Sequence, residues 1–229
     1  MLDADFAEWL QKGGALIADI EPGAVAEGFR GVIAKANIEE GTLLVAVPER
    51  LLLSAHSAKK DRAFAEALLA TNKQSIGSSQ VLAAHLLHEA SKGQESFWRP
   101  YLATLPRQYT CLSYFSPEDI RELQVEYAMD IASSVVEALR SDHTSVKPLL
   151  NALATVASRT MYLPDDAAGA LMPFGDLHNH RSPPAAATPD LGIPGGAQVP
   201  AEAQNDHGSS GSGQFDVGTR EYRLYAQTR

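Results

Sequence analysis

The chain has 229 residues, of which 45% are apolar, and a formal net charge of -9 at pH 7. This length and composition allow one sizeable hydrophobic core or two small ones, and they exclude a fibrous or wholly disordered protein. The acidic balance argues against a general affinity for nucleic acid, because binding to phosphates requires clustered lysine and arginine. We therefore expect a globular protein with no nucleic-acid partner.

The only cysteine is Cys111, which excludes intramolecular disulfides and a cysteine-rich zinc cluster. The longest apolar runs, such as residues 51–53 and 167–172, are far shorter than the roughly 18 residues that span a bilayer. The first ten residues carry early acidic side chains and no signal or transit pattern. We expect no membrane association. We also expect the protein to reside in a reducing intracellular compartment, which can be the cytosol, the nucleus or a plastid.

The first 54 residues predict a helix followed by a small β-rich unit. Phe6, Trp9 and Leu10 share one helical face in residues 3–12, and the glycine pair at 13–14 is typical of a left-handed helix end. Short strand-like runs then alternate with glycine-containing turns. These runs are residues 15–20, 31–34 and 42–47, the last of which is closed by Pro48.

From residue 57 to about 162 the apolar residues recur at helical spacing, which predicts about four helices. Ser116 and Pro117, followed by two acids, are typical of a helix start. A later helix is expected to end at Arg159. Its inward-facing residues are expected to be Leu149, Leu150, Leu153 and Val156.

The last third of the chain returns to strand or tight-turn character at residues 171–177. Residues 181–214 are rich in Pro, Ala, Gly and Ser and hold few large apolar side chains, so we expect a disordered loop. Residues 216–226 carry Tyr222, Leu224 and Ala226 at alternating positions and predict one more strand.

Three short segments carry polar residues in patterns that suggest chemistry. Residues 27–31 (Glu-Gly-Phe-Arg-Gly) form a turn where backbone groups can approach a ligand closely, although a simple β-turn has the same pattern. Arg159, in the pair Ser158-Arg159, is a candidate for ligand binding, but an arginine at the end of a helix is ordinarily a solvated residue that interacts with the helix dipole. Residues 176–180 read Asp-Leu-His-Asn-His.

Two metal readings are possible and both are disfavoured. Asp176, His178 and His180 alternate, but three ligands at this spacing without distant partners rarely complete a site. Residues 85–89 (His-Leu-Leu-His-Glu) lack the ligand, base and ligand order of zinc proteases, which favours a histidine-bearing amphipathic helix. We expect no metal.

These segments, in this order and at these distances, resemble one branch of the SET-domain methyltransferases, typified by the Rubisco large-subunit lysine methyltransferase. The most specific marker is the string at residues 96–102 (Ser-Phe-Trp-Arg-Pro-Tyr-Leu) with Leu105-Pro106, which matches the inserted helical region of that branch. Within it, Trp98 and Tyr101 are interpreted as core aromatics.

The resemblance implies an α+β fold: a SET-domain β-rich core with a large inserted helical region. Residues 1–56 are then the N-terminal SET segment, 57–162 the insertion, and 163–229 an incomplete C-terminal SET segment. It also implies S-adenosylmethionine as cofactor and a lysine-bearing protein as substrate, with the chain a monomer. The implied cofactor-binding residues are Glu27, Gly28, Phe29, Arg159, Asn179 and His180, and the implied substrate-binding residues are Arg159 and Asp176.

In the family, a catalytic tyrosine and a C-terminal substrate-binding domain follow the last strand. The chain ends at Arg229, before the position of that tyrosine, and Tyr222 and Tyr225 do not match its place in the order. No catalytic residue is therefore assigned, and we expect weak cofactor binding and little or no turnover.

Other functions stay open at this point. A sister branch methylates histidine on actin, so the acceptor can be histidine instead of lysine. A non-catalytic protein that keeps the SET scaffold to bind a partner is a second reading, and a metallohydrolase built on His178 and His180 is a remote third.

Overall fold

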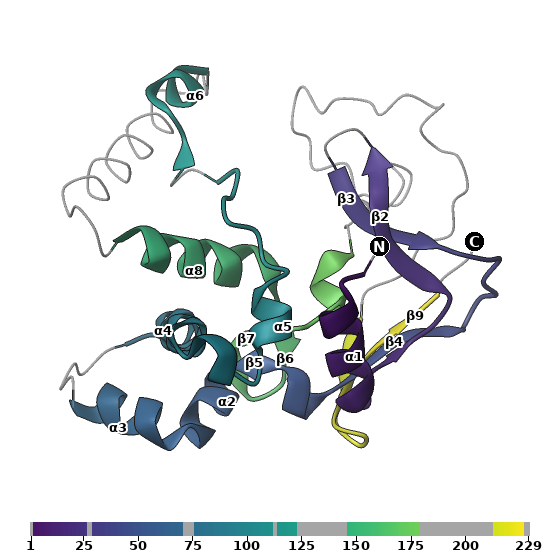
Figure 1. The fold of residues 1–229 in the computed structure, drawn as a ribbon, viewed down its shortest axis with the longest axis horizontal. Helices are drawn as coiled ribbons and strands as arrows, with labels where there is room; N and C mark the ends of the chain where they lie inside the picture. Colours follow the sequence, from purple (N-terminus) through teal and green to yellow (C-terminus); the bar gives the residue numbers. More distant parts are fainter. Residues whose placement is uncertain are drawn as a thin grey trace, which may run out of the picture.

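The computed structural model describes residues 2–26, 29–70, 76–111, 114–122, 146–178 and 213–226, and all structural statements below concern these residues (Figure 1). The α-helices are α1 (Ala4–Lys12), α2 (Ala55–Lys60), α3 (Arg62–Ala70), α4 (Ser78–Ser91), α5 (Arg99–Leu102), α6 (Pro117–Glu122) and α8 (Val146–Arg159). The short 3-10 helices are η1 (Glu49–Leu51), η2 (Gly93–Glu95) and η4 (Gly175–Leu177). The strands are β1 (Leu16–Ile17), β2 (Ile20–Ala26), β3 (Phe29–Ala34), β4 (Leu43–Pro48), β5 (Leu53–Ser54), β6 (Thr160–Leu163), β7 (Asp166–Leu171), β8 (Gln214–Asp216) and β9 (Glu221–Tyr225).

The strands form three small antiparallel sheets. One has the order β1-β4-β9-β8, one is the hairpin of β2 and β3, and one has the order β5-β7-β6. In the first sheet β4 pairs with β9, with Val47 opposite Tyr222, so two segments that are far apart in sequence form its centre. Helices α2, α3, α4, α6 and α8 lie on the left in Figure 1, whereas α1 lies on the right with β4, β9 and the β2-β3 hairpin.

The N-terminal helix forms where the sequence predicts it. Asp3 caps α1, because its side chain accepts hydrogen bonds from the backbone N–H groups of Asp5 and Phe6. Phe6 and Leu10 are buried on the predicted face. The left-handed residue after the helix is Gly14, with φ +71°, whereas Gly13 keeps a negative φ.

The sheet β5-β7-β6 packs against α2 and α4 and contributes to a single hydrophobic core. The buried apolar residues of this core come from the sheets and from α1, α4, α5 and α8, so sheets and helices stabilise one another. The largest fully buried apolar side chains are Tyr101, Phe6, Phe174, Leu10, Leu51, Leu52, Leu53, Leu82, Leu171 and Met172.

The predicted N-terminal strands, the helix start at Ser116 and the alternate burial of Tyr222, Leu224 and Ala226 are confirmed. The expected helix end at Arg159 is also confirmed, but the hairpin of β6 and β7 that follows it was not predicted. Two expectations were wrong. The last segment forms two strands, β8 and β9, instead of one. Leu149, expected to face inward on α8, is 41% exposed, whereas Val156, two turns further along the same face, is buried.

The described chain from Ser57 onward holds six α-helices, including α2, which starts just before this stretch, against the four expected. Most of the expected loop lies outside the described residues, and β8 begins at its last residue, Gln214. Among the described helices, none has both the length and the apolar character that a membrane crossing requires.

We predict that replacing Gly169 with alanine destabilises the β6-β7 hairpin. Gly169 has φ +70°, and a Cβ atom there would lie 2.3 Å from the backbone carbonyl oxygen of Met161. The left-handed conformation alone costs an L-residue about 1–2 kcal/mol, and the clash with backbone adds to it.

The matched control is Gly41→Ala, since Gly41 has φ +78° but no atom within 4 Å of the added Cβ. Urea unfolding of both variants measures the two losses. We expect Gly169→Ala to lose at least about 1 kcal/mol more than Gly41→Ala. Equal losses would show that the close approach of Met161 carries no energy.

Candidate functional site

Arg159 is the last residue of α8, and its side chain turns inward. The guanidinium Nη1 donates to Asp176 Oδ2 at 3.0 Å and to the Asp176 carbonyl oxygen at 3.2 Å. The Arg159 side chain is only 19% exposed. The alternative reading of a solvated arginine at a helix end is therefore wrong for this residue.

Asp176 lies in η4, the short turn that follows β7. Its side chain is 1% exposed, and Oδ2 also accepts a hydrogen bond from the Tyr101 hydroxyl at 2.8 Å. Two residues before it, the buried Phe174 adopts φ +72°, a conformation that is strained for a non-glycine residue. The surrounding packing holds Phe174 in this conformation. Strained backbone of this kind is often found at functional sites, where it fixes the direction of a side chain.

Tyr101 is the residue that the sequence analysis missed. It was interpreted as a core aromatic, and it is fully buried, but its hydroxyl supports the carboxylate of Asp176. The available signal was its type: a buried tyrosine needs a partner for its hydroxyl, whereas phenylalanine does not. The sequence could not name that partner, because Asp176 is 75 residues away.

The environment of Asp176 is both desolvated and charged. Burial raises the pKa of Asp176, against the Arg159 guanidinium and the Tyr101 hydroxyl, which lower it. Burial and the nearby Asp176 raise the pKa of Tyr101 well above its usual value. The hydroxyl therefore stays protonated and donates a hydrogen bond to the carboxylate. Asp176 Oδ1 and Arg159 Nε are buried and have no hydrogen-bond partner.

The predicted turn at residues 27–31 lies between two paired strands but is shorter than expected, because Phe29, Arg30 and Gly31 belong to β3. Ala26 of β2 pairs with Phe29 of β3 across it, and β3 contacts η4, which holds Asp176. Glu27 and Gly28, at the tip, lie outside the described residues, as do Asn179 and His180 after η4. The structure therefore brings Arg159, Asp176 and the strand that begins at Phe29 together, and it does not place the other four predicted residues.

The described residues do not test the metal reading of His178, because His180 lies outside them. His178 Nδ1 lies 3.1 Å from the carbonyl oxygen of Gly175, its ring packs edge-on against Phe174, and burial lowers its pKa. In the described part of the chain, neither Asp176 nor His178 belongs to a group of potential metal ligands.

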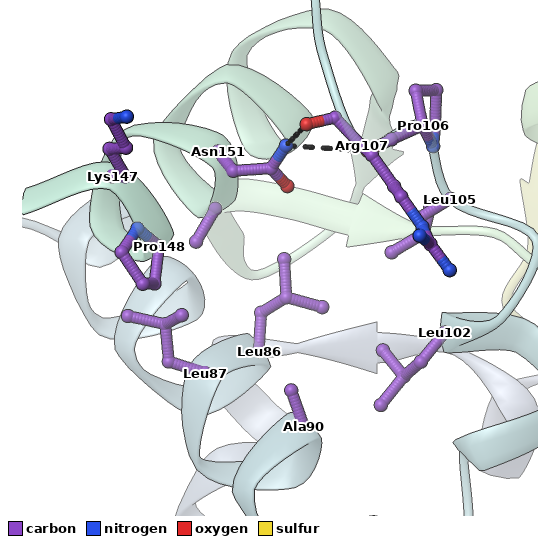
Figure 2. A pocket seen from close by; sticks show the side chains of 11 residues that line it. Leu86, Leu87, Ala90, Leu102, Leu105, Pro106, Arg107, Lys147, Pro148 and Asn151 are labelled. Atoms are coloured by element: carbon purple, nitrogen blue, oxygen red, sulfur yellow. Dashed lines mark hydrogen bonds between the residues drawn. The ribbon is translucent and has the colours of Figure 1, made fainter.

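A groove of about 410 Å³ opens between α4 and α8 and the segment after α5 (Figure 2). Leu86, Leu102 and Leu105 line it, and Asn151 at its edge donates to the carbonyl oxygens of Pro106 and Arg107. None of the predicted site residues lines this groove.

Comparison with known proteins shows which family the chain belongs to. The chain is similar to Protein SET DOMAIN GROUP 40 of Arabidopsis thaliana, with 34% identity over 173 residues, which are 68% of this chain and 35% of that protein. The solved SET domain of LSMT bound to lysine and AdoHcy aligns with a TM-score of 0.64 and 22% identity over 78% of this chain and 44% of that chain. The chain belongs to the SET-domain methyltransferase family.

Further SET-domain relatives give the same result. Rubisco LSMT bound to AdoMet aligns with a TM-score of 0.65 and 20% identity over 96% of this chain and 48% of that chain. Actin-histidine N-methyltransferase of Homo sapiens is 28% identical over 203 residues, which are 77% of this chain and 34% of that protein. The chain spans about a third of the length of the curated relatives that it matches. No family model matches it. The expected SET fold is thereby confirmed.

We predict that Tyr101→Phe destabilises the chain in a pH-dependent way. The lost hydrogen bond leaves a buried carboxylate less satisfied, which costs about 1–3 kcal/mol at pH 7. Tyr101 stabilises the ionised form of Asp176, so its removal raises the Asp176 pKa further. The loss should therefore be smaller at pH 4, where more of the carboxyl is protonated, than at pH 7.

Denaturant unfolding of Tyr101→Phe, Asp176→Asn and the double variant at both pH values measures this coupling. The expected result is a smaller effect of Tyr101→Phe when residue 176 is already uncharged. Equal losses in both backgrounds and at both pH values would contradict a specific hydroxyl–carboxylate interaction.

Proposed function

We propose that this chain is an S-adenosylmethionine-dependent protein N-methyltransferase of the SET family, with lysine as the acceptor. The observation that carries the proposal is the buried Arg159–Asp176 pair, held by Tyr101 beside the β2-β3 hairpin. It supports the proposal because the fold is that of SET domains whose solved relatives are bound to AdoMet or AdoHcy.

The described residues fit this cofactor. S-adenosylmethionine carries a carboxylate, an ammonium group and a sulfonium cation, so its site needs both an N–H donor and a carboxylate. Arg159 Nε and Asp176 Oδ1, which belong to one ion pair, provide a donor and an acceptor that have no hydrogen-bond partner among the described residues. We propose that Arg159 and the backbone at Phe29 contact the cofactor, together with Glu27, Gly28, Asn179 and His180. Asp176, together with Arg159, would line the substrate side.

The bound cofactor supplies an activated methyl group on its sulfonium. The chain's contribution is electrostatic and positional. Asp176 offers negative charge in a low-dielectric site, where a fixed charge acts more strongly than in water. Tyr101 and Arg159 fix the orientation of that carboxylate, and burial of the cluster excludes water.

The acceptor must arrive as a neutral amine, since a protonated amine has no lone pair for attack. Lysine, with a reference pKa near 10.4, must lose its proton in a desolvated channel, which lowers the pKa of an amine. We assign no catalytic tyrosine: Tyr222 lies in β9, its buried hydroxyl has no partner, and burial raises its pKa to about 12.

We predict that the purified chain binds S-adenosylmethionine and that Arg159→Ala weakens this binding at least about tenfold, or about 1.4 kcal/mol. Isothermal titration calorimetry measures both affinities. The matched control is Arg223→Ala, because Arg223 is also a part-buried, ion-paired arginine but lies in β9, where it pairs with Glu221 and Asp216. Its affinity should equal that of the unaltered chain.

No heat of binding in a folded, unaltered chain would contradict the cofactor proposal and favour a SET scaffold used only to bind a partner. Equal weakening in both arginine variants would show a general loss of stability and remove Arg159 from the site.

Histidine is the second candidate acceptor, because the chain is similar to several actin-histidine N-methyltransferases at 28–29% identity over 77% of its length. The two acceptors differ in how the rate depends on pH. The neutral fraction of lysine rises steeply between pH 7 and 9, whereas histidine, with a pKa near 6.5, is already mostly neutral.

Because we expect little turnover from this chain, the test compares slow residual rates. With labelled S-adenosylmethionine and actin or Rubisco as substrate, we expect the residual transfer to rise at least about tenfold from pH 7 to 9. Mass spectrometry should then locate the methyl group on lysine. A rate that changes less than about twofold, with methyl on histidine, would replace lysine as the proposed acceptor.

A further inference from the structure

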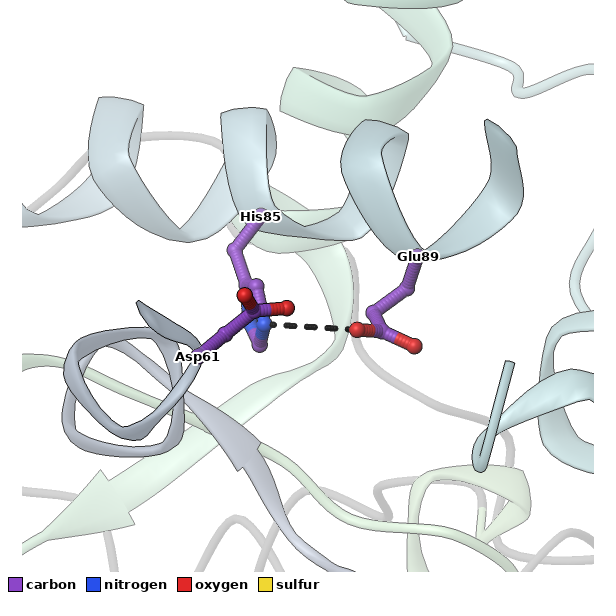
Figure 3. Close-up of side chains that lie close together, drawn as sticks. All are labelled: Asp61, His85 and Glu89. Carbon is purple, nitrogen blue, oxygen red and sulfur yellow. Dashed lines mark ion pairs between the residues drawn. The ribbon is translucent and has the colours of Figure 1, made fainter. Parts of the chain in front are cut away.

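A second cluster of ionisable side chains lies where α2 meets α3 and near the end of α4, away from the Arg159–Asp176 pair. It consists of Asp61, His85 and Glu89, whose facing ligand atoms all lie within 4.8 Å of one another (Figure 3). His85 and Glu89 are one turn apart on α4 and are both buried, and Asp61 approaches them from the α2-α3 junction.

Both carboxylates are held so that one oxygen faces the centre of the cluster. Asp61 Oδ1 accepts from the backbone N–H of Phe64, which leaves Oδ2 facing inward. Glu89 Oε2 accepts from the Ser96 hydroxyl at 2.6 Å, which leaves Oε1 facing inward. Carboxylates that bind metals are usually oriented by such hydrogen bonds to their second oxygen.

The unpaired ring nitrogens of His85 indicate that the cluster binds a ligand. Its side chain is fully buried between Phe64 and Trp98, and neither ring nitrogen has a hydrogen-bond partner. Nε2 faces Glu89 Oε1 at 3.7 Å, too far for a hydrogen bond.

The cation at this centre is Lys92. Its ammonium donates to Asp61 Oδ2 at 2.6 Å and to Glu89 Oε1, and it holds the pKa of Asp61 well below its usual range. The Lys92 side chain is 30% exposed and follows the last residue of α4, so it can swing into solvent. One lysine leaves the two carboxylates with a net charge of -1, whereas a divalent cation would neutralise them.

We propose that Asp61, His85 and Glu89 bind a divalent transition metal of the Zn²⁺ class, and that Lys92 occupies the centre when the metal is absent. Ligand atoms around a tetrahedral zinc at 2.0–2.1 Å are about 3.3 Å apart. The separation of 3.7 Å between His85 Nε2 and Glu89 Oε1 needs little adjustment to reach this value. His88 Nε2 contacts only Asp61 of these three ligands and is 29% exposed, so a water molecule would complete the coordination on the open side.

One imidazole and two carboxylates suit zinc and other borderline first-row metals, whereas magnesium and calcium prefer oxygen ligands alone. The competing interpretation is a closed ion-pair network in which Lys92 is a permanent structural partner. The two interpretations make opposite predictions for Lys92. Removal of a competitor tightens metal binding, whereas removal of a structural partner creates no site.

The test is calorimetric titration of the chelator-treated, full 229-residue chain with ZnCl₂, with MgCl₂ as the negative metal. We expect one equivalent of zinc to bind and magnesium not to bind. Lys92→Met should bind zinc at least tenfold more tightly, and Glu89→Gln at least tenfold more weakly. His56→Ala is the matched control, since His56 is exposed on α2 outside the cluster, and its affinity should not change.

Co²⁺ provides a second readout that does not depend on the variants. Bound at a tetrahedral site of nitrogen and oxygen ligands, it should give visible absorption bands that zinc removes. The absence of zinc binding in the folded, unaltered chain, together with no Co²⁺ spectrum, would overturn the proposal. So would zinc binding that His56→Ala weakens and Glu89→Gln leaves unchanged.

Discussion

The carboxylate of Asp176 is the group on which the proposed site depends. It is almost fully buried, and such a charge is tolerated only when it is paired and hydrogen-bonded. Arg159 at the end of α8 and Tyr101 in α5 provide these interactions, and they come from positions 17 and 75 residues away. One carboxylate thus fixes a helix end, a helix of the insertion and the turn after β7 relative to one another.

The two buried ionic clusters described above, around Asp176 and around Glu89, differ in their cation. Asp176 pairs with arginine, whose planar guanidinium is always charged and forms several directed hydrogen bonds, so the geometry around it is rigid. Asp61 and Glu89 pair with lysine, a point charge on a flexible stem, at the partly exposed end of α4. The first cluster is suited to holding a carboxylate at one orientation, and the second to exchanging one cation for another.

The position of the Asp176 cluster relative to the hairpin gives it functional meaning. The β5-β7-β6 sheet leads into η4, which lies against β3, so the buried Arg159–Asp176 ion pair lies beside a strand of the hairpin. The apolar groove between α4 and α8 lies elsewhere and holds none of these residues. In a SET-family chain, this juxtaposition is the strongest support for a cofactor site at the hairpin.

The sequence by itself determined the local elements: the capped helix with Phe6 and Leu10 inside, the start of α6 at Ser116 and the alternate burial in β9. It also indicated the family, because the string around Trp98 and the Asp-Leu-His-Asn-His segment are specific. Local patterns failed at Leu149 and at the β6-β7 hairpin, where small residues such as Ala152, Ala154 and Gly169 allow close packing that hydrophobic periodicity does not reveal.

Only the tertiary structure decided which polar groups meet. That Tyr101 supports Asp176, and that Asp61 joins His85 and Glu89, depends on segments brought together by the shared core. Sequence spacing reports neighbours along one helix or strand, but the partner of a buried charge is set by packing between elements. The sequence therefore identified the ionisable residues, but it could not predict which of them pair with one another.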